Sequence, residues 1–347
     1  MRLASILVAL LLLPACQDQA NGGGGGARAE IRVVGSSTVY PFTTTVAERF
    51  VATDPHAAAP VIESTGTGAG MKLFCAGIGA AHPDIEDASR RIKPGEYRSC
   101  AANGAGRLME VRIGIDGIAF AQARNGPALP LTPALLYRAL AATPGGRPNT
   151  ARLWRDLRAD LPAVPIQVYG PPTTSGTRDA LAELILTRGC EDVDPAAKPL
   201  AARDPDAAKA LCTRIREDGA YVDAGENDNL IVQKLGSNPN AIGVFGYSYL
   251  EENRDAVRGL PIAGVAPTYA TIADGSYPGS RPLFLYVKKA HLDAVPGLRA
   301  FLRLYAQAWG PGGPLVKRGL IAAPDAVRAA AAQEIARETP LDPATLK

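Results

Sequence analysis

Residues 31–52 read IRVVGSSTVYPFTTTVAERFVA, and this stretch joins a predicted strand to a predicted helix through a short Gly/Ser/Thr loop. β-branched residues dominate 31–34, and apolar residues recur at helical spacing over 41–52. The same design returns in PVIESTGTGAGMKLFCAG at 60–77 and in IQVYGPPTTSGTRDALAELIL at 166–186. Strands that alternate with helices in this way predict an α/β fold with parallel strands and helices on both faces of the sheet.

Other segments extend this α/β pattern along the chain. Residues 109–120, MEVRIGIDGIAF, are typical of a strand, and we expect a break in it at Asp116-Gly117. A further strand is expected at 282–287, and helices are expected at 131–140 and 298–309. No internal repeat is visible.

The three Gly/Ser/Thr loops have the composition of an anion site. They are the first loop (35–39, GSSTV), the second loop (65–70, TGTGAG) and the third loop (173–178, TTSGTR). The first N–H groups of a helix lack internal partners, and hydroxyls add donors, so such loops suit an oxyanion. Each loop alone is better explained by helix capping without a ligand, because Ser or Thr before a helix is most often an N-cap; the occurrence of three such loops in one chain is what favours an anion site. The second loop spaces its glycines as GxGxG, which misses the dinucleotide fingerprint, and no P-loop occurs.

Composition excludes several classes of protein. The 347 residues are 47% hydrophobic and 20% charged, with 36 Gly and 29 Pro, which allows two domains of ordinary size with many loops. A net charge of +3 without a Lys/Arg run argues against nucleic acid as a partner. No His/Cys spacing indicates a metal site, and no motif indicates a cofactor.

The N-terminus carries export signals. Residues 1–15, MRLASILVALLLLPA, predict a signal peptide, and Cys16 follows where a bacterial lipoprotein carries its lipidated cysteine. Residues 16–28 contain five consecutive glycines and predict a flexible tether, so the membrane is reached by the lipid anchor only. The alternative is an ordinary signal peptide that leaves Cys16 as a spare thiol.

The other four cysteines predict two disulfides, because an exported protein enters an oxidising compartment. Three pairings of these cysteines are possible. We favour the pairing of sequence neighbours, Cys75–Cys100 and Cys190–Cys212. Each closed loop then stabilises the fold by about 3 kcal/mol.

Several segments together resemble the phosphate-binding proteins of bacterial phosphate ABC transporters. They are GSSTVYPF, TGTGAG followed by DIEDASRRIKPGE, GPPTTSGTRDAL, GENDNLIVQKLGSNPNAIGVFGYSYL and, more weakly, YPGSRPLFLYV. The matches occur in family order from about residue 31 to residue 250. The resemblance implies a type II periplasmic-binding fold, in which two lobes, each a mixed sheet flanked by helices, close on phosphate in the cleft between them. Lobe I would comprise 29–117 and 262–347, and lobe II 118–261.

The resemblance also implies a ligand set and partners. The predicted ligand residues are Ser37, Thr38, Val39, Thr67, Arg90, Ser175, Gly176, Thr177 and Arg178. The expected protein is a periplasmic, lipid-anchored monomer that binds inorganic phosphate and delivers it to the permease subunits of an ABC importer.

Two positions depart from the family pattern. Arg90 stands where the family has an aspartate that accepts the proton of hydrogen phosphate, and Pro171 stands where it has an arginine. Arg90 and Arg178 are the candidate charge-neutralising replacements, with solvent-facing or structural ion pairs as the alternative. Glu226 or Asp228 is a candidate for the missing acceptor, with turn or capping roles as the alternative. Without that acceptor the rejection of sulfate weakens, so another oxyanion such as sulfate remains an alternative ligand.

Two other classes of function compete with transport. An exported serine hydrolase would use Ser175, but no GxSxG motif occurs, and none of the three histidines lies beside a nucleophile motif. A lectin-like or adhesion module would not depend on the loop hydroxyls. We therefore expect a binding protein and no enzyme.

Overall fold

The computed structural model describes residues 28–173, 175–225 and 228–346. The predictions for the signal peptide, for lipidation at Cys16 and for the tether up to residue 27 lie outside the described residues. None of the helices in the described ranges has the length and apolar character that crossing a bilayer requires.

The chain begins with the strand–helix alternation that the loop pattern predicts. The first elements are β1 (Arg32–Gly35), α1 (Tyr40–Thr53), β2 (Val61–Ser64), α2 (Thr67–Phe74), β3 (Ile85–Ala88), α3 (Pro94–Ala102) and β4 (Leu108–Ala123). Helix α2 starts inside the second loop, at Thr67. Gly66 makes this start possible, because its φ of 77° lies in the left-handed region that glycine adopts without strain.

The rest of the chain contributes five strands and most of the helices among the described residues. The elements up to β6 are α4 (Pro133–Leu140), α5 (Trp154–Leu157), β5 (Val168–Gly170), α6 (Gly176–Ala180), a π-helical segment (Leu181–Leu186), α7 (Thr187–Val193), α8 (Ala197–Arg203), α9 (Pro205–Thr213) and β6 (Tyr221–Asp223). The elements after β6 are α10 (Asp228–Ser237), β7 (Ile242–Gly246), α11 (Tyr247–Glu252), β8 (Val257–Gly259), α12 (Tyr269–Ala273), β9 (Ser280–Lys288), α13 (Leu298–Ala308) and α14 (Asp325–Arg337). Short 3₁₀ turns lie at Pro144–Gly146, Lys289–His291, Val316–Arg318 and Pro343–Thr345.

The described strands form one nine-stranded mixed sheet in the order β2-β1-β3-β9-β4-β7-β5-β6, with β8 paired to β4. Strand β1 is parallel to β2 and β3, and β5 is parallel to β6 and β7. Strand β9 is antiparallel to β3 and β4, and β4 is antiparallel to β7 and β8. The expectation of parallel strands is therefore wrong at the centre, where β4 joins the two parallel groups into one sheet.

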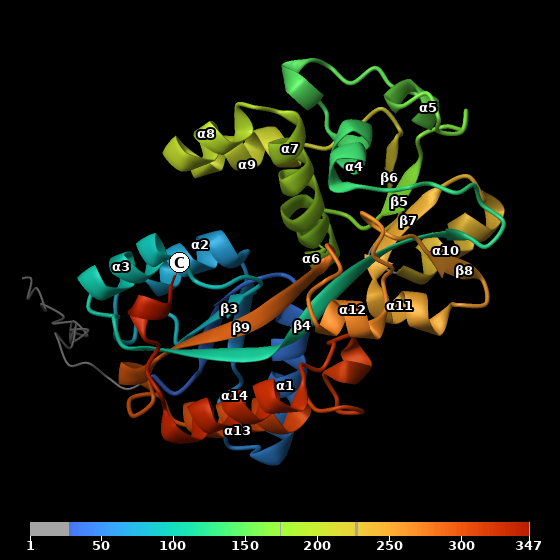
Figure 1. Ribbon diagram of the computed structural model, residues 1–347. Coiled ribbons are helices and arrows are strands. Elements are labelled where there is room, and N and C mark those ends of the chain that lie inside the picture. The colour runs from blue at the N-terminus through green and yellow to red at the C-terminus, as the bar shows by residue number, and fades with distance from the viewer. Residues whose placement is uncertain (1–27, 174, 226–227, 347) are drawn as a thin grey trace, which may run out of the picture.

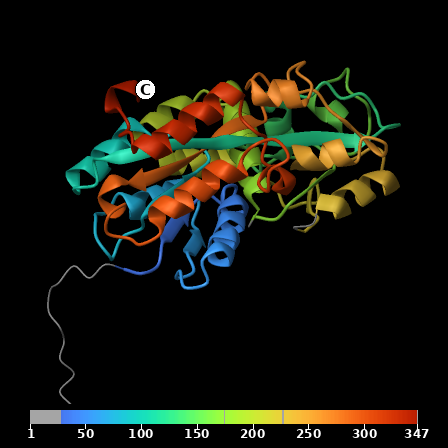
Figure 2. The same ribbon diagram turned by 90° about the horizontal axis from the view of Figure 1, so that it is seen from below.

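Strand β4 runs unbroken through Asp116 and Gly117, so the predicted break is wrong. Asp116 pairs with Arg281 of β9, and Gly117 pairs with Ser280. The hydrogen bonds of this ladder override the local turn preference of Asp-Gly. Figure 2 shows that β4 extends along much of the length of the molecule, so one strand reaches both parallel groups.

Helices cover both faces of the β1–β3 group. Helices α2 and α3 lie on one face, and α1, α13 and α14 lie on the other (Figure 1). The second face holds Val46, Phe50, Phe301 and Tyr305, with aromatic edge-to-face contacts from Phe301 to Phe50 and to Tyr305. Burial of large apolar side chains of this kind stabilises each by about 1.5–3 kcal/mol.

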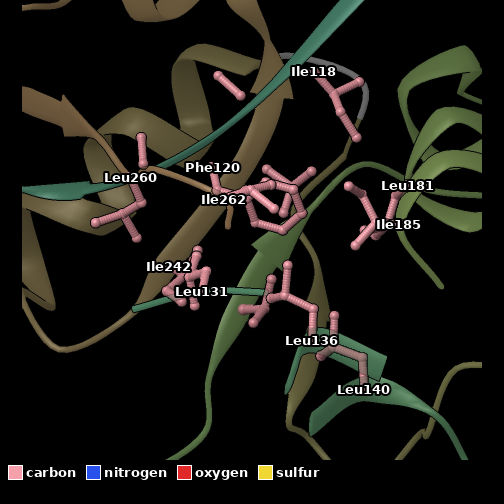
Figure 3. Close-up of a cluster of buried hydrophobic side chains, with 14 of the residues drawn as sticks. Ile118, Phe120, Leu131, Leu136, Leu140, Leu181, Ile185, Ile242, Leu260 and Ile262 are labelled. Atoms are coloured by element: carbon pink, nitrogen blue, oxygen red, sulfur yellow. The ribbon is translucent and has the colours of Figure 1, made fainter. Parts of the chain in front are cut away.

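A separate apolar cluster surrounds the β5–β7 group. Figure 3 shows side chains from β4, β7 and the helices around them converging, among them Phe120, Leu136, Ile185 and Ile242. All four are fully buried. The β5–β7 group thus has its own core, separate from the clusters on the two faces of the β1–β3 group, and β4 and β9 link the two groups.

Both disulfides pair as predicted from sequence proximity. Cys75, which follows α2, bonds to Cys100 of α3, and Cys190 of α7 bonds to Cys212 of α9. The first disulfide belongs to the apolar cluster on the α2–α3 face of the β1–β3 group, and the second belongs to the cluster around the β5–β7 group. The cysteine pairing is therefore confirmed.

Candidate functional site

The first loop leaves β1 at Gly35, which is packed against the backbone of Asp87 on β3. Its φ is 130°, and a Cβ there would lie 2.1 Å from the Asp87 carbonyl oxygen, so only glycine fits. The hydroxyl of Ser36 accepts a hydrogen bond from the Thr38 N–H at 3.2 Å. The Ser36 carbonyl accepts one from the Val39 N–H, also at 3.2 Å. These bonds fix the backbone that carries the predicted ligand residues.

The second loop is bonded directly to the first. The Gly35 carbonyl accepts hydrogen bonds from the N–H groups of Thr65, at 2.9 Å, and Gly66, at 2.8 Å. Thr67, the first residue of α2, accepts a bond from the Ser89 N–H at 3.0 Å, and the two hydroxyls lie 3.0 Å apart. Thr67 and Ser89 are both buried. The first two loops and the residue that follows β3 therefore form one bonded unit.

The third loop meets the first loop across the molecule. Ser175 caps α6 by accepting a hydrogen bond from the Thr177 N–H at 3.2 Å. The Thr38 hydroxyl donates to the Gly176 carbonyl at 3.1 Å. A Cβ on Gly176 would lie 2.5 Å from the Thr38 Cα, so the two backbones touch. Figure 1 shows α6 at the junction between the β1–β3 part and the β5–β8 part of the fold.

A second contact between these loops involves an acidic residue that we did not predict. The Ser37 hydroxyl donates to Oδ2 of Asp179 at 2.6 Å. Asp179 lies in the first turn of α6, directly after the predicted ligand residue Arg178. The signal in the sequence was its position beside the third loop, but nothing local indicates that it reaches the first.

Arg281 of β9 connects the first loop to both parts of the fold, and sequence reasoning missed it. Its side chain is only 4% exposed. It donates to the Thr38 hydroxyl at 2.7 Å and pairs with Glu183 at 2.6 Å and with Asp116 at 3.3 Å. Burial raises the pKa of Asp116, although the charge of Arg281 opposes that rise. An arginine at the start of the apolar SRPLFLYV strand was the available signal, because such a charge requires partners when buried.

The two arginines predicted as ligands have other contacts in the structure. Arg90 forms a two-bond pair with Glu96, at 2.7 and 2.9 Å. Burial opposes the charge on Arg90, but the hydrogen bonds and charge of Glu96, with smaller contributions from Glu183 and Glu86, raise its pKa. The Arg178 guanidinium lies 4.1 Å from the centre of the Tyr221 ring. Each arginine therefore lies close in sequence to residues of the predicted site, but its side chain contacts a protein residue: Glu96 for Arg90 and Tyr221 for Arg178.

Glu226 and Asp228 are the candidates for the missing acceptor, and β3 carries two further acidic residues. Glu226 lies outside the described residues, and Asp228 accepts a long hydrogen bond from the Gly246 N–H at 3.4 Å. Glu86 and Asp87 on β3 are buried, and their carboxyls keep three oxygens without a hydrogen-bond partner. Burial raises the pKa of Asp87 to about 8 and that of Glu86 well above its ordinary value.

Nothing in the described ranges forms a nucleophile–base pair with Ser175. The buried His291 instead bonds to Asp84 at 2.6 Å and accepts from the Gly79 N–H at 2.9 Å. In the part of the chain that the structure describes, no group of three or more His, Cys, Asp or Glu side chains is arranged to hold a metal ion. A groove of about 530 Å³ between α1 and α13 contains none of the predicted ligand residues.

Comparisons with known proteins identify a family for the chain and several similar proteins. Residues 20–308 match the PBP superfamily domain. The chain is similar to protein SphX of Synechococcus elongatus, with 30% identity over 82% of this chain and 75% of that protein. It is also similar to phosphate-binding protein PstS of Staphylococcus saprophyticus, with 28% identity over 87% of this chain and 83% of that protein. The crystal structure of a possible phosphate binding protein from Planctomyces limnophilus matches with a TM-score of 0.71 and 30% identity, over 89% of this chain and 98% of that chain.

Proposed function

The chain belongs to the PBP superfamily, and from that premise we propose that it binds inorganic phosphate and delivers it to the permease of an ABC importer. The observation that carries this proposal is the convergence of the three loops, seen in the contact between Thr38 and Gly176. Relatives named as phosphate-binding proteins support phosphate as the ligand.

The proposed ligand set contains neutral donors from all three loops. Backbone N–H groups of Ser37, Thr38, Val39, Gly176 and Thr177, together with the hydroxyls of Thr67, Ser175 and Thr177, would surround the anion. Helix N-termini favour negative charge, and α2 and the continuous helical stretch that starts at Gly176 both begin at these loops. Arg90 and Arg178 would supply positive charge from the rim, and each keeps its present partner as a support.

The proposed action is closure of two lobes around the anion. Lobe I would be 29–117 with 262–347, and lobe II would be 118–261. The first and second loops belong to the former range and the third loop to the latter, so the ligand would touch both lobes. A ligand drives closure only when it binds the closed form more tightly, and contact with both lobes provides that difference.

The proposed location is the outer face of a membrane. A signal peptide at 1–15, lipidation at Cys16 and a tether over 16–28 would hold the monomeric body close to its permease. The two disulfides suit an oxidising compartment.

Isothermal titration of the protein with phosphate and with sulfate tests the ligand. We expect saturable phosphate binding and weaker sulfate binding. We also expect Ser175→Ala to weaken phosphate binding by about ten-fold or more, because a hydrogen bond to a charged ligand contributes about 1.5–3 kcal/mol. Ser99→Ala removes an exposed hydroxyl on α3 and serves as the matched control. Absence of phosphate binding, or equally tight sulfate binding, would overturn the proposal.

A fluorophosphonate probe separates binding from hydrolysis. Ser175 acts as an anion ligand in our proposal, so the probe should leave it unlabelled. Stoichiometric labelling of Ser175 would favour the serine hydrolase instead. An adhesion module would keep its activity when Ser175 is replaced by alanine.

A further inference from the structure

Asp179 is the one acidic side chain in the described part of the chain that hydrogen-bonds to a hydroxyl of the predicted ligand set. Its Oδ2 accepts from Ser37 at 2.6 Å. Both residues are partly buried, at the place where the first loop meets the third. A carboxylate here requires an explanation, because a site for an anion should exclude negative charge.

Three carboxylates around the loops are paired with arginines, and Asp179 is not. Glu183 and Asp116 pair with Arg281, and Glu96 pairs with Arg90. Like Asp179, Glu86 and Asp87 on β3 form no ion pair with a described residue, but burial raises the pKa of both carboxyls, which favours their neutral form. Asp179 forms no ion pair with any residue that the structure describes, and the Ser37 hydroxyl is its side-chain partner. Its carboxylate therefore lies beside a predicted ligand residue without a cation paired to it.

The hydroxyl groups of Ser37 and Thr38 in the first loop already donate their hydrogens to protein acceptors. A serine or threonine hydroxyl has one hydrogen to donate and two lone pairs that accept. Ser37 donates its hydrogen to Asp179, and Thr38 donates its hydrogen to the Gly176 carbonyl while accepting from Arg281. Neither side chain has a hydrogen left for an anion, so what they and Asp179 offer a ligand is a set of acceptors.

Acceptors at an anion site distinguish oxyanions by their protons. Phosphate carries one or two hydrogens near neutral pH and can donate one to a carboxylate. Sulfate carries none, so it cannot hydrogen-bond to a carboxylate and is repelled by its charge. The affinity for sulfate is therefore lower.

We propose that Asp179, held in place by Ser37, is the hydrogen-bond acceptor that makes this site prefer a protonated oxyanion over sulfate. This inference rests on the proposed function, since it assigns selectivity to the same site. Asp179 then fills the role for which Glu226 and Asp228 were candidates from sequence. Asp228 instead bonds to the backbone at the end of β7.

The test is the ratio of phosphate affinity to sulfate affinity, measured by calorimetry for the wild type and Asp179→Asn. The amide replaces an acceptor with a donor at nearly constant shape. We expect it to weaken phosphate binding, to strengthen sulfate binding and to lower the ratio by about ten-fold or more, which corresponds to about 1.4 kcal/mol. Asp206→Asn, an equal charge change at an exposed residue of α9, should leave the ratio unchanged.

Other outcomes contradict the inference in recognisable ways. If Asp179→Asn weakens both anions by the same factor, Asp179 is only a contact that holds the loops together. If the variant binds both anions more tightly, the carboxylate competes with the ligand. In either case the wild type still binds phosphate, so the proposed function stands, whereas a wild type that binds no phosphate removes the function itself. Circular dichroism checks folding, and Asp179→Ala, with the same expected fall in the ratio, replaces the asparagine variant if that one does not fold.

Discussion

The first and second loops differ from the third in how they are held. The first two are joined by backbone hydrogen bonds from Thr65 and Gly66 to the Gly35 carbonyl, within one parallel group of strands. The third loop reaches them through the side chains of Ser37, Thr38 and Arg281. Backbone bonds within a sheet break only when the sheet does, whereas a few side-chain bonds can open locally.

This difference assigns separate tasks to the two regions. The bonded pair of loops forms a fixed half of the proposed anion site, and its residues should affect folding. The third loop is the half that can separate, and its residues should affect ligand affinity. Gly35 and Gly176, neither of which has room for a Cβ, allow this division to be tested.

Gly35→Ala should give the largest loss of stability. The new methyl group would meet the Asp87 backbone at 2.1 Å, and the φ of 130° strains any residue with a Cβ. We expect a cost above about 4 kcal/mol, a size that diagnoses a specific steric fault. Urea unfolding or soluble yield measures it.

Gly176→Ala is the matched substitution in the third loop. Its methyl group would lie 2.5 Å from Thr38, but no positive φ strains it, and the loop can move away. We expect phosphate affinity to fall by about ten-fold or more while the free energy of unfolding changes much less than in Gly35→Ala. If Gly176→Ala destabilises the protein as much as Gly35→Ala, the two regions are equally fixed.

Arg281→Met should have the next largest effect, because Arg281 joins the two regions. The substitution leaves Asp116 without its cation and removes the partner of Glu183, and breaking a buried ion pair in this way costs about 3–5 kcal/mol. The exposed pair of Arg158 and Asp160 provides the control, since Arg158→Met should cost less than about 1 kcal/mol. If Arg281→Met and Arg158→Met lower the free energy of unfolding by similar amounts, the ion pairs of Arg281 contribute no more to stability than an exposed pair.

The sequence was sufficient for the parts of the site that depend on local chemistry. The loops were recognisable because the same strand, Gly/Ser/Thr loop and helix occur three times in one chain. The approach of Asp179 to Ser37 was not predictable, because it depends on how two distant segments meet. The continuity of β4 at Asp116 and the role of Arg281 were missed for the same reason, since strand register is fixed by partners far along the chain.

Removing each disulfide in turn compares how much the two parts of the fold depend on their crosslinks. Their sequence separations are 25 and 22 residues, so the loop-closure contribution is nearly equal at about 3 kcal/mol each. We expect the Cys75→Ala/Cys100→Ala and Cys190→Ala/Cys212→Ala double variants to lose similar stability in thermal unfolding. If only one double variant loses stability, the part of the fold that contains the other disulfide is stable without it. The two regions would then differ in their dependence on a crosslink as well.

A prediction of a different kind depends on pH and concerns Asp87, in the fixed region beside the first loop. Its carboxyl accepts from the Thr43 hydroxyl at 2.7 Å, and burial raises its pKa to about 8. Between about pH 4 and pH 8 the unfolded chain therefore releases a proton that the folded chain retains. Stability from this group is complete below about pH 4 and falls as pH rises, by at most about 1.4 kcal/mol per pH unit.

Asp87→Asn imitates the neutral acid and removes this pH dependence. Its amide oxygen still accepts from Thr43, so we expect little change in unfolding free energy at pH 4 and a growing gain toward pH 8. Urea unfolding of both proteins at pH 4, 6 and 8 measures the difference, in which the other titrating groups largely cancel. A constant difference would mean that Asp87 is ionised in the folded protein. The fixed region would then carry an uncompensated buried charge beside the first loop, and its stability would have to come from elsewhere.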